Sequence, residues 1–218
     1  MLYHLLFPLS EQISAFNIFR YITFRTFASF MLATLICIIW GKTFIAFMKK
    51  KQFGQVIRED GPESHYKKAG TPTMGGVFMV GSMVISLLIC GNFNSIPLLL
   101  SLLVFFSFFL LGFLDDYFKV LKKNTDGISA KGKLLWQFAT ALVACFLIQY
   151  LGVQSGQLYV PFVKGPLLDL GWFYPFFGAL VIVGSSNAVN LTDGLDGLAT
   201  GPIITSAATL GILAYAAG

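Results

Sequence analysis

The feature that most constrains the fold is an uncharged stretch of 46 residues, 69–114. A helix that crosses a bilayer needs roughly 20 apolar residues, so this stretch is long enough for two crossings. Charged residues make up only 11% of the chain and apolar residues 56%, with a mean hydropathy of +0.76. Soluble domains typically contain about 25% charged residues. The sequence therefore predicts an all-α polytopic membrane protein.

Apolar runs separated by polar segments predict about six transmembrane helices in a single transmembrane domain over residues 1–218. The expected spans are 22–48, 73–90, 96–114, 134–151, 172–188 and 201–217. The expected polar loops are 49–72, 115–133 and 189–200 on one side, and 91–95 and 152–171 on the other. Within the last of these loops, the alternating sequence QLYVPFV predicts a short strand or hairpin. The chain ends at Gly218 directly after the sixth apolar run, so we expect it to be a portion of a longer membrane protein.

The distribution of basic residues predicts the orientation. Eleven of the 15 Lys and Arg residues fall in the loops at 49–72 and 115–133, which two spans separate. Short basic loops stay in the cytoplasm, so both loops are expected to be cytosolic and the N-terminus to face outward. By the same parity the loop at 189–200 is cytosolic. Arg20 and Arg25, on the outward flank, go against this rule.

Four polar side chains with helical spacing mark the segment NAVNLTDGLDGLATG at 187–201. Asn187 and Asn190 are three residues apart, and so are Asp193 and Asp196. If the segment is helical, like groups lie on one face and both carboxylates can point into one cavity. A charged side chain at a membrane border needs a partner, a cation or water. The alternative interpretation is a polar loop whose Asn and Asp residues cap the next helix.

A second pair of carboxylates, Asp115 and Asp116, closes the third predicted span in GFLDDYFKV at 112–120. Adjacent carboxylates repel each other, so they need a cation, a shared proton or a basic neighbour such as Lys119. The end of a helix is an unfavourable place for negative charge, which favours a functional reason for the pair. The alternative is a solvated acidic step at a helix end.

The segment GTPTMGG at 70–76 opens the second predicted span. Its glycines and hydroxyls leave backbone N–H groups free to bind an anion such as a phosphate. Equally, it can be an ordinary helix start, with Gly75 and Gly76 serving helix packing. Most lysines set the topology and contact anionic lipid headgroups, and a subset beside the carboxylates can hold a diphosphate.

These polar groups are all expected on one cytosolic membrane face. Carboxylates at a site suited to phosphate indicate Mg²⁺, which binds one or two carboxylates together with substrate phosphates. Phosphoryl transfer is the reaction class that such a site serves, because its catalysis consists mainly of positioning and charge neutralisation. A site at the bilayer border suits one water-soluble substrate and one lipid substrate.

Four motifs together, DGPESH at 60–65, GTPTMGG, GFLDDYFKV and NAVNLTDGLDGLATG, resemble the polyprenyl-phosphate N-acetylhexosamine-1-phosphate transferases. The first two are similar to the bacterial branch that transfers phospho-N-acetylmuramoyl-pentapeptide. The resemblance runs from about the first span to Gly218 and corresponds to about six of the family's ten spans. The family's later cytosolic loops supply a further aspartate and a histidine-rich motif, which this chain does not contain, so we expect its active site to be incomplete.

The resemblance implies a reaction and its participants. Phospho-MurNAc-pentapeptide moves from UDP-MurNAc-pentapeptide onto undecaprenyl phosphate, giving lipid I and UMP with Mg²⁺ in the first membrane step of peptidoglycan synthesis. The implied location is the bacterial cytoplasmic (inner) membrane, with the active site on the cytosolic face. The expected partners are the two substrates and the bilayer, with no nucleic acid, and a homodimer is left open.

The resemblance also implies site residues. The catalytic residues are Asp115, Asp116 and Asp193, and the magnesium ligands are Asp193 and Asp116. The substrate-binding residues are Gly70, Thr71, Thr73, Lys133, Asn190, Gly194, Leu195 and Asp196. In the leading hypothesis Asp115 deprotonates the lipid phosphate, whose oxygen attacks the β-phosphate of the UDP-sugar. A two-step route through an aspartyl-phosphate stays open, because a carboxylate can act as nucleophile.

Other functions stay open at this point. Within the same superfamily, the chain can be a transferase for a different UDP-HexNAc. A transporter also uses intramembrane carboxylates, but it is expected to place them near the midplane and to show inverted repeats. A non-catalytic fragment is the third alternative.

Overall fold

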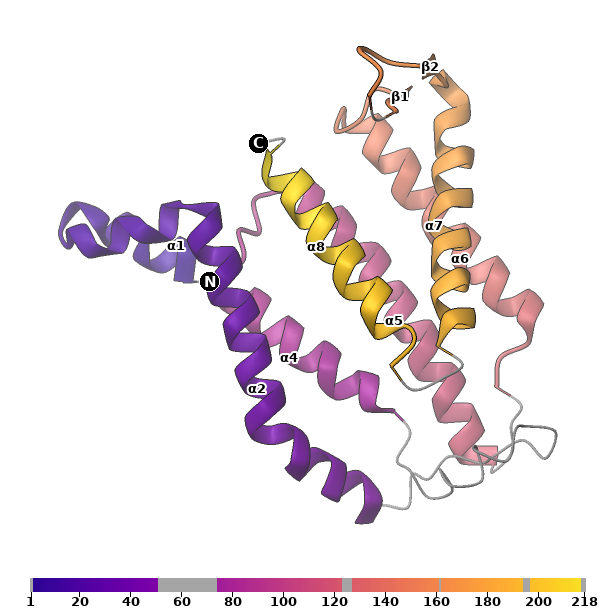
Figure 1. Cartoon of the computed structure of the whole chain (residues 1–218), viewed down its shortest axis with the longest axis horizontal. Helices are drawn as coiled ribbons and strands as arrows, with labels where there is room; N and C mark the ends of the chain where they lie inside the picture. The colour runs from indigo at the N-terminus through magenta and orange to yellow at the C-terminus, as the bar shows by residue number, and fades with distance from the viewer. Residues whose placement is uncertain (1, 51–73, 123–126, 161, 194–196, 217–218) are drawn as a thin grey trace. The chain divides into compact units, whose positions relative to one another are not determined.

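The computed structural model describes residues 2–50, 74–122, 127–160, 162–193 and 197–216, and these residues are almost entirely helical (Figure 1). The α-helices are α1 (Leu2–Leu6), α2 (Ile22–Lys50), α4 (Gly75–Cys90), α5 (Ile96–Lys122), α6 (Ala130–Tyr150), α7 (Tyr174–Thr192) and α8 (Thr200–Ala216). Short 3₁₀ turns are η1 (Pro8–Glu11), η2 (Ser14–Arg20) and η3 (Gly171–Phe173). The predicted all-α fold is confirmed.

Four helical segments are long and apolar enough to cross a membrane. They are Ile22–Lys50, Ile96–Lys122, Ala130–Tyr150 and Gly171–Thr192, with 29, 27, 21 and 22 residues. Large apolar side chains are exposed along them, for example Phe27 at 66% and Ile38 at 67% on α2, as expected where a helix faces lipid. The chain is a multi-pass membrane protein. The spans predicted at 73–90 and 201–217 fall on the shorter apolar helices α4 and α8, and their crossing stays a prediction.

Several helices extend beyond their predicted ends, and this changes the setting of the carboxylates. The helix α6 begins at Ala130, four residues before the predicted start at 134, and α2 continues two residues past 48 to Lys50. The third span was expected to end at residue 114, but α5 continues for two further turns to Lys122. Asp115 and Asp116 therefore lie inside a helix and not at its C-terminus, so the argument from an unfavourable helix end is wrong. The continuation is stabilised by the i, i+4 ion pair between Asp115 and Lys119. Likewise α7 extends to Thr192, so part of the loop predicted at 189–200 is helical.

The chain divides into two compact units, Met1–Lys133 and Leu134–Gly218, whose positions relative to each other are not determined. In the first unit, α2, α4 and α5 are the long elements. In the second unit α6 packs on α7 through small side chains, and Ala141 and Ala179 are fully buried. A Cβ placed on Gly178 would lie 2.7 Å from the Cys145 sulfur, so glycine is needed for this close approach.

One polar contact ties the two helices of the second unit together. The Asn187 side-chain Nδ2 donates to Gln137 Oε1 on α6 at 2.8 Å and to the Val183 carbonyl on its own helix at 2.8 Å. Gln137 is buried, with 8% of its surface exposed. Both amide hydrogens of Asn187 are thus used inside the helix pair.

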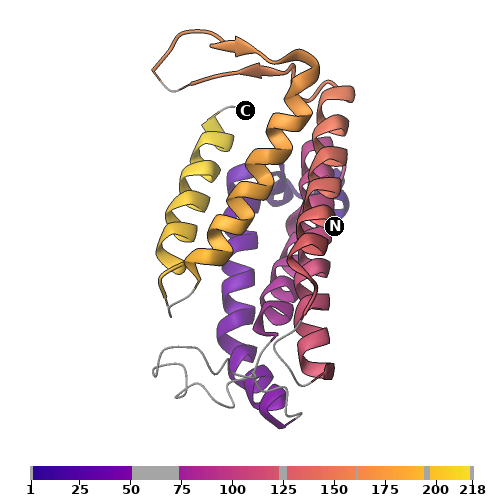
Figure 2. The ribbon, with the colours of Figure 1, turned by 90° about the vertical axis from the view of Figure 1, so that its right-hand side faces the viewer.

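The connection before α7 forms the hairpin that the alternating sequence predicted. β1 (Gln157–Leu158) pairs antiparallel with β2 (Leu168–Asp169), with Gln157 opposite Asp169 and Leu158 opposite Leu168 (Figure 2). The Leu170 N–H closes it by donating to the Gly156 carbonyl at 3.0 Å.

Removing the α6–α7 polar contact should destabilise the second unit. In Gln137→Leu the Asn187 amide loses its interhelical acceptor, and we expect the unfolding free energy in detergent micelles to fall by about 0.6–2 kcal/mol. Asn190→Leu is the matched control, because Asn190 is exposed on the same helix. Equal losses in both variants would contradict a stabilising role for this contact.

Candidate active site

The predicted site residues fall into three groups. Asp115, Asp116 and Lys133 lie in the first unit, and Asn190 and Asp193 lie in the second. The remaining predicted residues, Gly70, Thr71, Thr73, Gly194, Leu195 and Asp196, are outside the residues that the structure describes.

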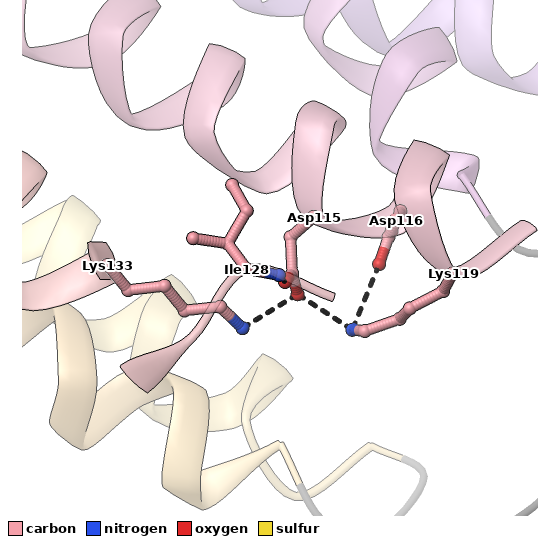
Figure 3. Close-up of polar contacts among 5 residues, drawn as sticks. All are labelled: Asp115, Asp116, Lys119, Ile128 and Lys133. Atoms are coloured by element: carbon pink, nitrogen blue, oxygen red, sulfur yellow. Dashed lines mark hydrogen bonds and ion pairs between the residues drawn. The ribbon is translucent and has the colours of Figure 1, made fainter. Parts of the chain in front are cut away.

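Asp115 is the centre of an ionic cluster (Figure 3). Its Oδ2 accepts from the ammonium groups of Lys119 and Lys133, each at 2.7 Å. Its Oδ1 accepts from the backbone N–H of Ile128 at 2.7 Å. Only 10% of the Asp115 side chain is exposed. The two cations and the N–H stabilise the ionised carboxylate, because they interact with the negative charge more strongly than with the protonated acid.

The start of α6 brings Lys133 to this carboxylate. Ser129 caps the helix: its Oγ accepts from the Gly132 N–H at 3.2 Å, and its carbonyl accepts from the Lys133 N–H at 2.9 Å. The cap fixes where α6 begins, so Lys133 lies on its first turn. Lys119 reaches the same carboxylate from one turn further along α5, at the i, i+4 position.

Gly127 is a site residue that the sequence did not indicate. A Cβ at this position would overlap Asp115 Oδ1 and lie 2.7 Å from its carboxyl carbon and 3.0 Å from Lys119 Cε. The backbone before α6 can therefore approach Asp115 only because residue 127 has no side chain. The signal is weak in sequence, since a glycine in a polar loop is ordinary.

Asp116 differs sharply from its neighbour. Its side chain is 42% exposed, and its one ion pair with a described residue is a 3.5 Å contact with Lys119. The two adjacent aspartates thus differ in how freely they can bind a ligand. The carboxylate of Asp115 already accepts hydrogen bonds from the protein, whereas the carboxylate of Asp116 is exposed.

The lysines of the cluster can also bind an anion. Lys119 and Lys133 are 37% and 35% exposed, and each ammonium has three N–H donors. One carboxylate cannot use all of them. Two ammonium groups within hydrogen-bond reach of one oxygen make a positive site, and a phosphate oxygen is the natural acceptor for the remaining donors.

In the second unit, Asp193 ends α7. Its backbone N–H donates to the Val189 carbonyl at 3.1 Å, and its side chain is exposed. Asn190, one turn earlier, is also exposed. Asn187 is not part of this polar surface, because its amide is held by Gln137. Asn187, which is spaced from Asn190 as Asp193 is from Asp196, therefore serves the packing of α7 on α6.

The residues present fit a magnesium ion of the kind that substrates help to hold. Within the described ranges, no group of three or more His, Cys, Asp or Glu side chains could hold a metal. Mg²⁺ usually takes only one or two protein carboxylates and completes its shell with water and phosphate oxygens. Asp116 in the first unit and Asp193 in the second are each, taken separately, an exposed carboxylate of this kind, whereas both oxygens of Asp115 are already used.

The comparison with known proteins agrees with this chemistry. Residues 98–218, more than half of the chain, match the family described as Glycosyl transferase family 4. The chain belongs to this family. Residues 68–80 also match the sequence described as Phospho-N-acetylmuramoyl-pentapeptide-transferase signature 1. The family 4 match includes Asp115, Lys133 and Asp193.

Curated relatives of this glycosyl transferase family 4 chain carry one name. The phospho-N-acetylmuramoyl-pentapeptide-transferase of Desulfotalea psychrophila is 49% identical over 218 residues, which are all of this chain and 61% of that protein. Proteins of the same name from Pelobacter propionicus and Oleidesulfovibrio alaskensis are 47% and 46% identical, with the same coverage. The chain thus spans about 61% of the length of these relatives.

Replacing the two adjacent aspartates should have unequal effects on stability. In Asp115→Asn two ammonium groups lose their shared anion in a buried place, so we expect the unfolding free energy to fall by about 1–3 kcal/mol. Asp116→Asn removes one long, exposed ion pair and should cost less than about 1 kcal/mol. Thermal unfolding in detergent micelles measures both.

Gly127→Ala provides an independent check on the same cluster. The added methyl group would displace the Asp115 carboxylate, so this variant should resemble Asp115→Asn. If Asp115→Asn and Asp116→Asn were equally stable, the cluster would not hold the first unit together.

Proposed function

We propose that the protein transfers phospho-MurNAc-pentapeptide from UDP-MurNAc-pentapeptide to undecaprenyl phosphate, giving lipid I and UMP. The support is the 46–49% identity of the whole chain to proteins named for this transfer, together with the signature at residues 68–80. This reaction is the first membrane step of peptidoglycan synthesis. Transfer of a phosphosugar to a lipid phosphate needs a positive site that can bind phosphate, and the lysines of the Asp115 cluster supply one.

We assign Lys119 and Lys133 to the phosphates. Asp115 holds both ammonium groups in place, so that their free N–H donors can face the diphosphate of the nucleotide. Neutralising the charge that builds up on the phosphate oxygens is the main task in phosphoryl transfer. Asn190 remains assigned to the nucleotide pocket, as do Gly194, Leu195 and Asp196, and the segment 70–73 remains assigned to the uridine.

The general-base role expected for Asp115 stays a prediction, and its contacts weaken it. Three donors stabilise the carboxylate, which lowers its tendency to take a proton. A phosphate monoester has its second pKa at about 6, so the lipid phosphate is largely ionised at neutral pH without a strong base. Positioning of the lysines is the role that the geometry of Asp115 supports best.

Asp116 and Asp193 are the carboxylates that would hold Mg²⁺. When bound, the ion supplies positive charge that polarises the diphosphate and stabilises the leaving UMP. The two side chains are exposed in their separate units, and each has an oxygen that makes no short ion pair with a described residue.

We place the protein in the bacterial cytoplasmic membrane with this site on the cytosolic face. Lys49 and Lys50 end α2, Lys119 and Lys122 lie in the last turns of α5, and Lys131 and Lys133 begin α6. Basic residues at these helix ends are typical of the cytosolic side. A homodimer stays a prediction.

The test of the catalytic assignment uses the full reading frame that contains these 218 residues. Asp116→Asn and Asp193→Asn should each lower Mg²⁺-dependent UMP release by roughly 10²-fold or more, because each removes charge that is needed at the diphosphate. Removal of divalent ions by EDTA should abolish release, and added Mg²⁺ should restore it. Asp169→Asn, an exposed aspartate on the hairpin, is the matched control and should keep full activity.

Full UMP release by Asp193→Asn or Asp116→Asn would overturn the assignment. The dependence of the rate of UMP release on pH, measured for Asp115→Asn, distinguishes the two possible roles of Asp115. A general base would be seen as the loss of the acid limb of the profile, whereas a positioning residue would lower the rate at every pH.

The donor distinguishes this function from that of a related transferase. We expect UDP-MurNAc-pentapeptide to be used with a kcat/KM at least about 10²-fold above that of UDP-GlcNAc, because a site built to bind the peptide leaves polar groups unpaired without it. A preference for UDP-GlcNAc would identify a transferase for another UDP-HexNAc. Ion flux into liposomes without nucleotide turnover would indicate a transporter.

A further inference from the structure

A cavity of about 790 Å³ lies between α2, α4 and α5, within the first unit. Natural small-molecule sites have volumes of about 300–1,000 Å³, so it is large enough for a ligand. Its wall is mainly apolar and includes Phe30, Ala33, Met83, Leu102 and Phe105.

Most polar residues of the cavity gather at one end. Arg25, Thr26 and Ser29 come from the first turns of α2, and Asn92 and Ser95 come from the turn between α4 and α5. The other two polar lining residues, Ser86 and Ser101, bond their hydroxyls to carbonyls of their own helices. Along α2 the lining continues from Arg25 to Ala33, a distance of about 12 Å at the rise of an α-helix. The cavity therefore has a polar end and an apolar body.

Arg25 is a cation in an apolar helix, and no acidic side chain among the described residues neutralises it. Its Nε is buried and has no hydrogen-bond partner within the described part of the chain. Its guanidinium carbon lies 4.4 Å from the centre of the Tyr3 ring, and a cation–π contact offsets only part of the lost hydration. The ion pairs found among the described residues all involve Asp115 or Asp116 and not Arg25.

The N-terminal helix completes the polar end. Tyr3 packs on Arg25, and the neighbouring His4 accepts through Nε2 from the Phe93 N–H of the α4–α5 turn at 3.3 Å. Three segments that are distant in sequence thus meet around the guanidinium group.

The predicted membrane topology does not explain why an arginine lies at position 25. Basic residues are expected on the cytosolic side, but Arg25 lies at the predicted outward end of α2. An ionisable residue within a membrane helix is costly, and such residues usually serve a ligand or a partner. An anion is the partner that would neutralise Arg25.

We propose that this cavity binds an anionic phospholipid, with its phosphate on Arg25 and one acyl chain along the apolar body. A guanidinium group donates two parallel hydrogen bonds to a phosphate, which suits an Arg with an unused donor. The hydroxyls of Thr26 and Ser29 and the amide of Asn92 can serve the remaining headgroup oxygens. The apolar wall formed by α2, α4 and α5 complements a hydrocarbon chain. This site is separate from the ionic cluster, and the proposal does not depend on the transferase activity.

Native mass spectrometry of the intact protein, with phosphatidylglycerol or phosphatidylcholine added in detergent, tests the proposal. The unaltered protein should retain one phosphatidylglycerol and discriminate against the zwitterionic lipid. Arg25→Gln removes the charge and should weaken phosphatidylglycerol binding about tenfold, the equivalent of one charge-assisted hydrogen bond. Arg20→Gln is the matched control, because Arg20 is an exposed cation of η2 outside the cavity lining, and it should bind as before.

A second variant keeps the test decisive if Arg25→Gln fails to fold. Ala33→Phe places a ring in the apolar body without touching the charge, and it should also weaken lipid binding while leaving lipid-free unfolding nearly unchanged. Equal lipid binding in Arg25→Gln and Arg20→Gln would overturn the proposal. The proposal would also be overturned if the lipid-free protein were a dimer and Arg25→Gln dissociated it. In that case a second copy of the chain would occupy the cavity. Failure of any lipid to bind the folded monomer would assign it to another segment of a longer chain.

Discussion

A charge at the edge of an apolar bilayer must find a counter-charge, and this requirement governs the two polar regions of the first unit. Asp115 finds its counter-charges within the protein, in Lys119 and Lys133, and also accepts from the Ile128 N–H. Arg25 has an aromatic ring beside it but no anion among the described residues. The first arrangement builds a positive surface suited to phosphates, and the second leaves a cation that an anionic lipid can satisfy.

In the second unit the polar groups that need partners are uncharged. The α6–α7 pair is held by buried alanines, by Gly178 against Cys145, and by the Asn187–Gln137 hydrogen bond. Helices in lipid gain little from the hydrophobic effect when they associate, so small side chains and a few polar contacts hold them together. A rigid pair of this kind gives α7 a defined end, and Asp193 lies at that end.

Much of the fold could be predicted, because the membrane makes hydrophobic runs easy to recognise. The apolar runs, the short loop at 91–95 and the hairpin at 157–169 all appear in the structure. The helix ends were less predictable. Asp115 and Asp116 looked like a terminal step, but Lys119 pairs with both and allows α5 to continue past them. Asn187 shared the spacing of the candidate ligands, yet it packs against α6, since spacing along one helix does not specify its neighbour.

Sequence alone determined that the chain is a helical membrane protein and that its motifs resemble those of phosphosugar transferases. It also predicted that the lysine-rich loops share one side of the membrane. Composition and short motifs carry this information because a bilayer penalises every unpaired polar group. Only the tertiary structure decided which polar groups are already satisfied. It gave the two adjacent aspartates different surroundings and placed Gly127 against a carboxylate. It also left Arg25 without an anion among the described residues, at the polar end of a cavity. These outcomes depend on contacts between segments distant in sequence, and local periodicity cannot specify such contacts.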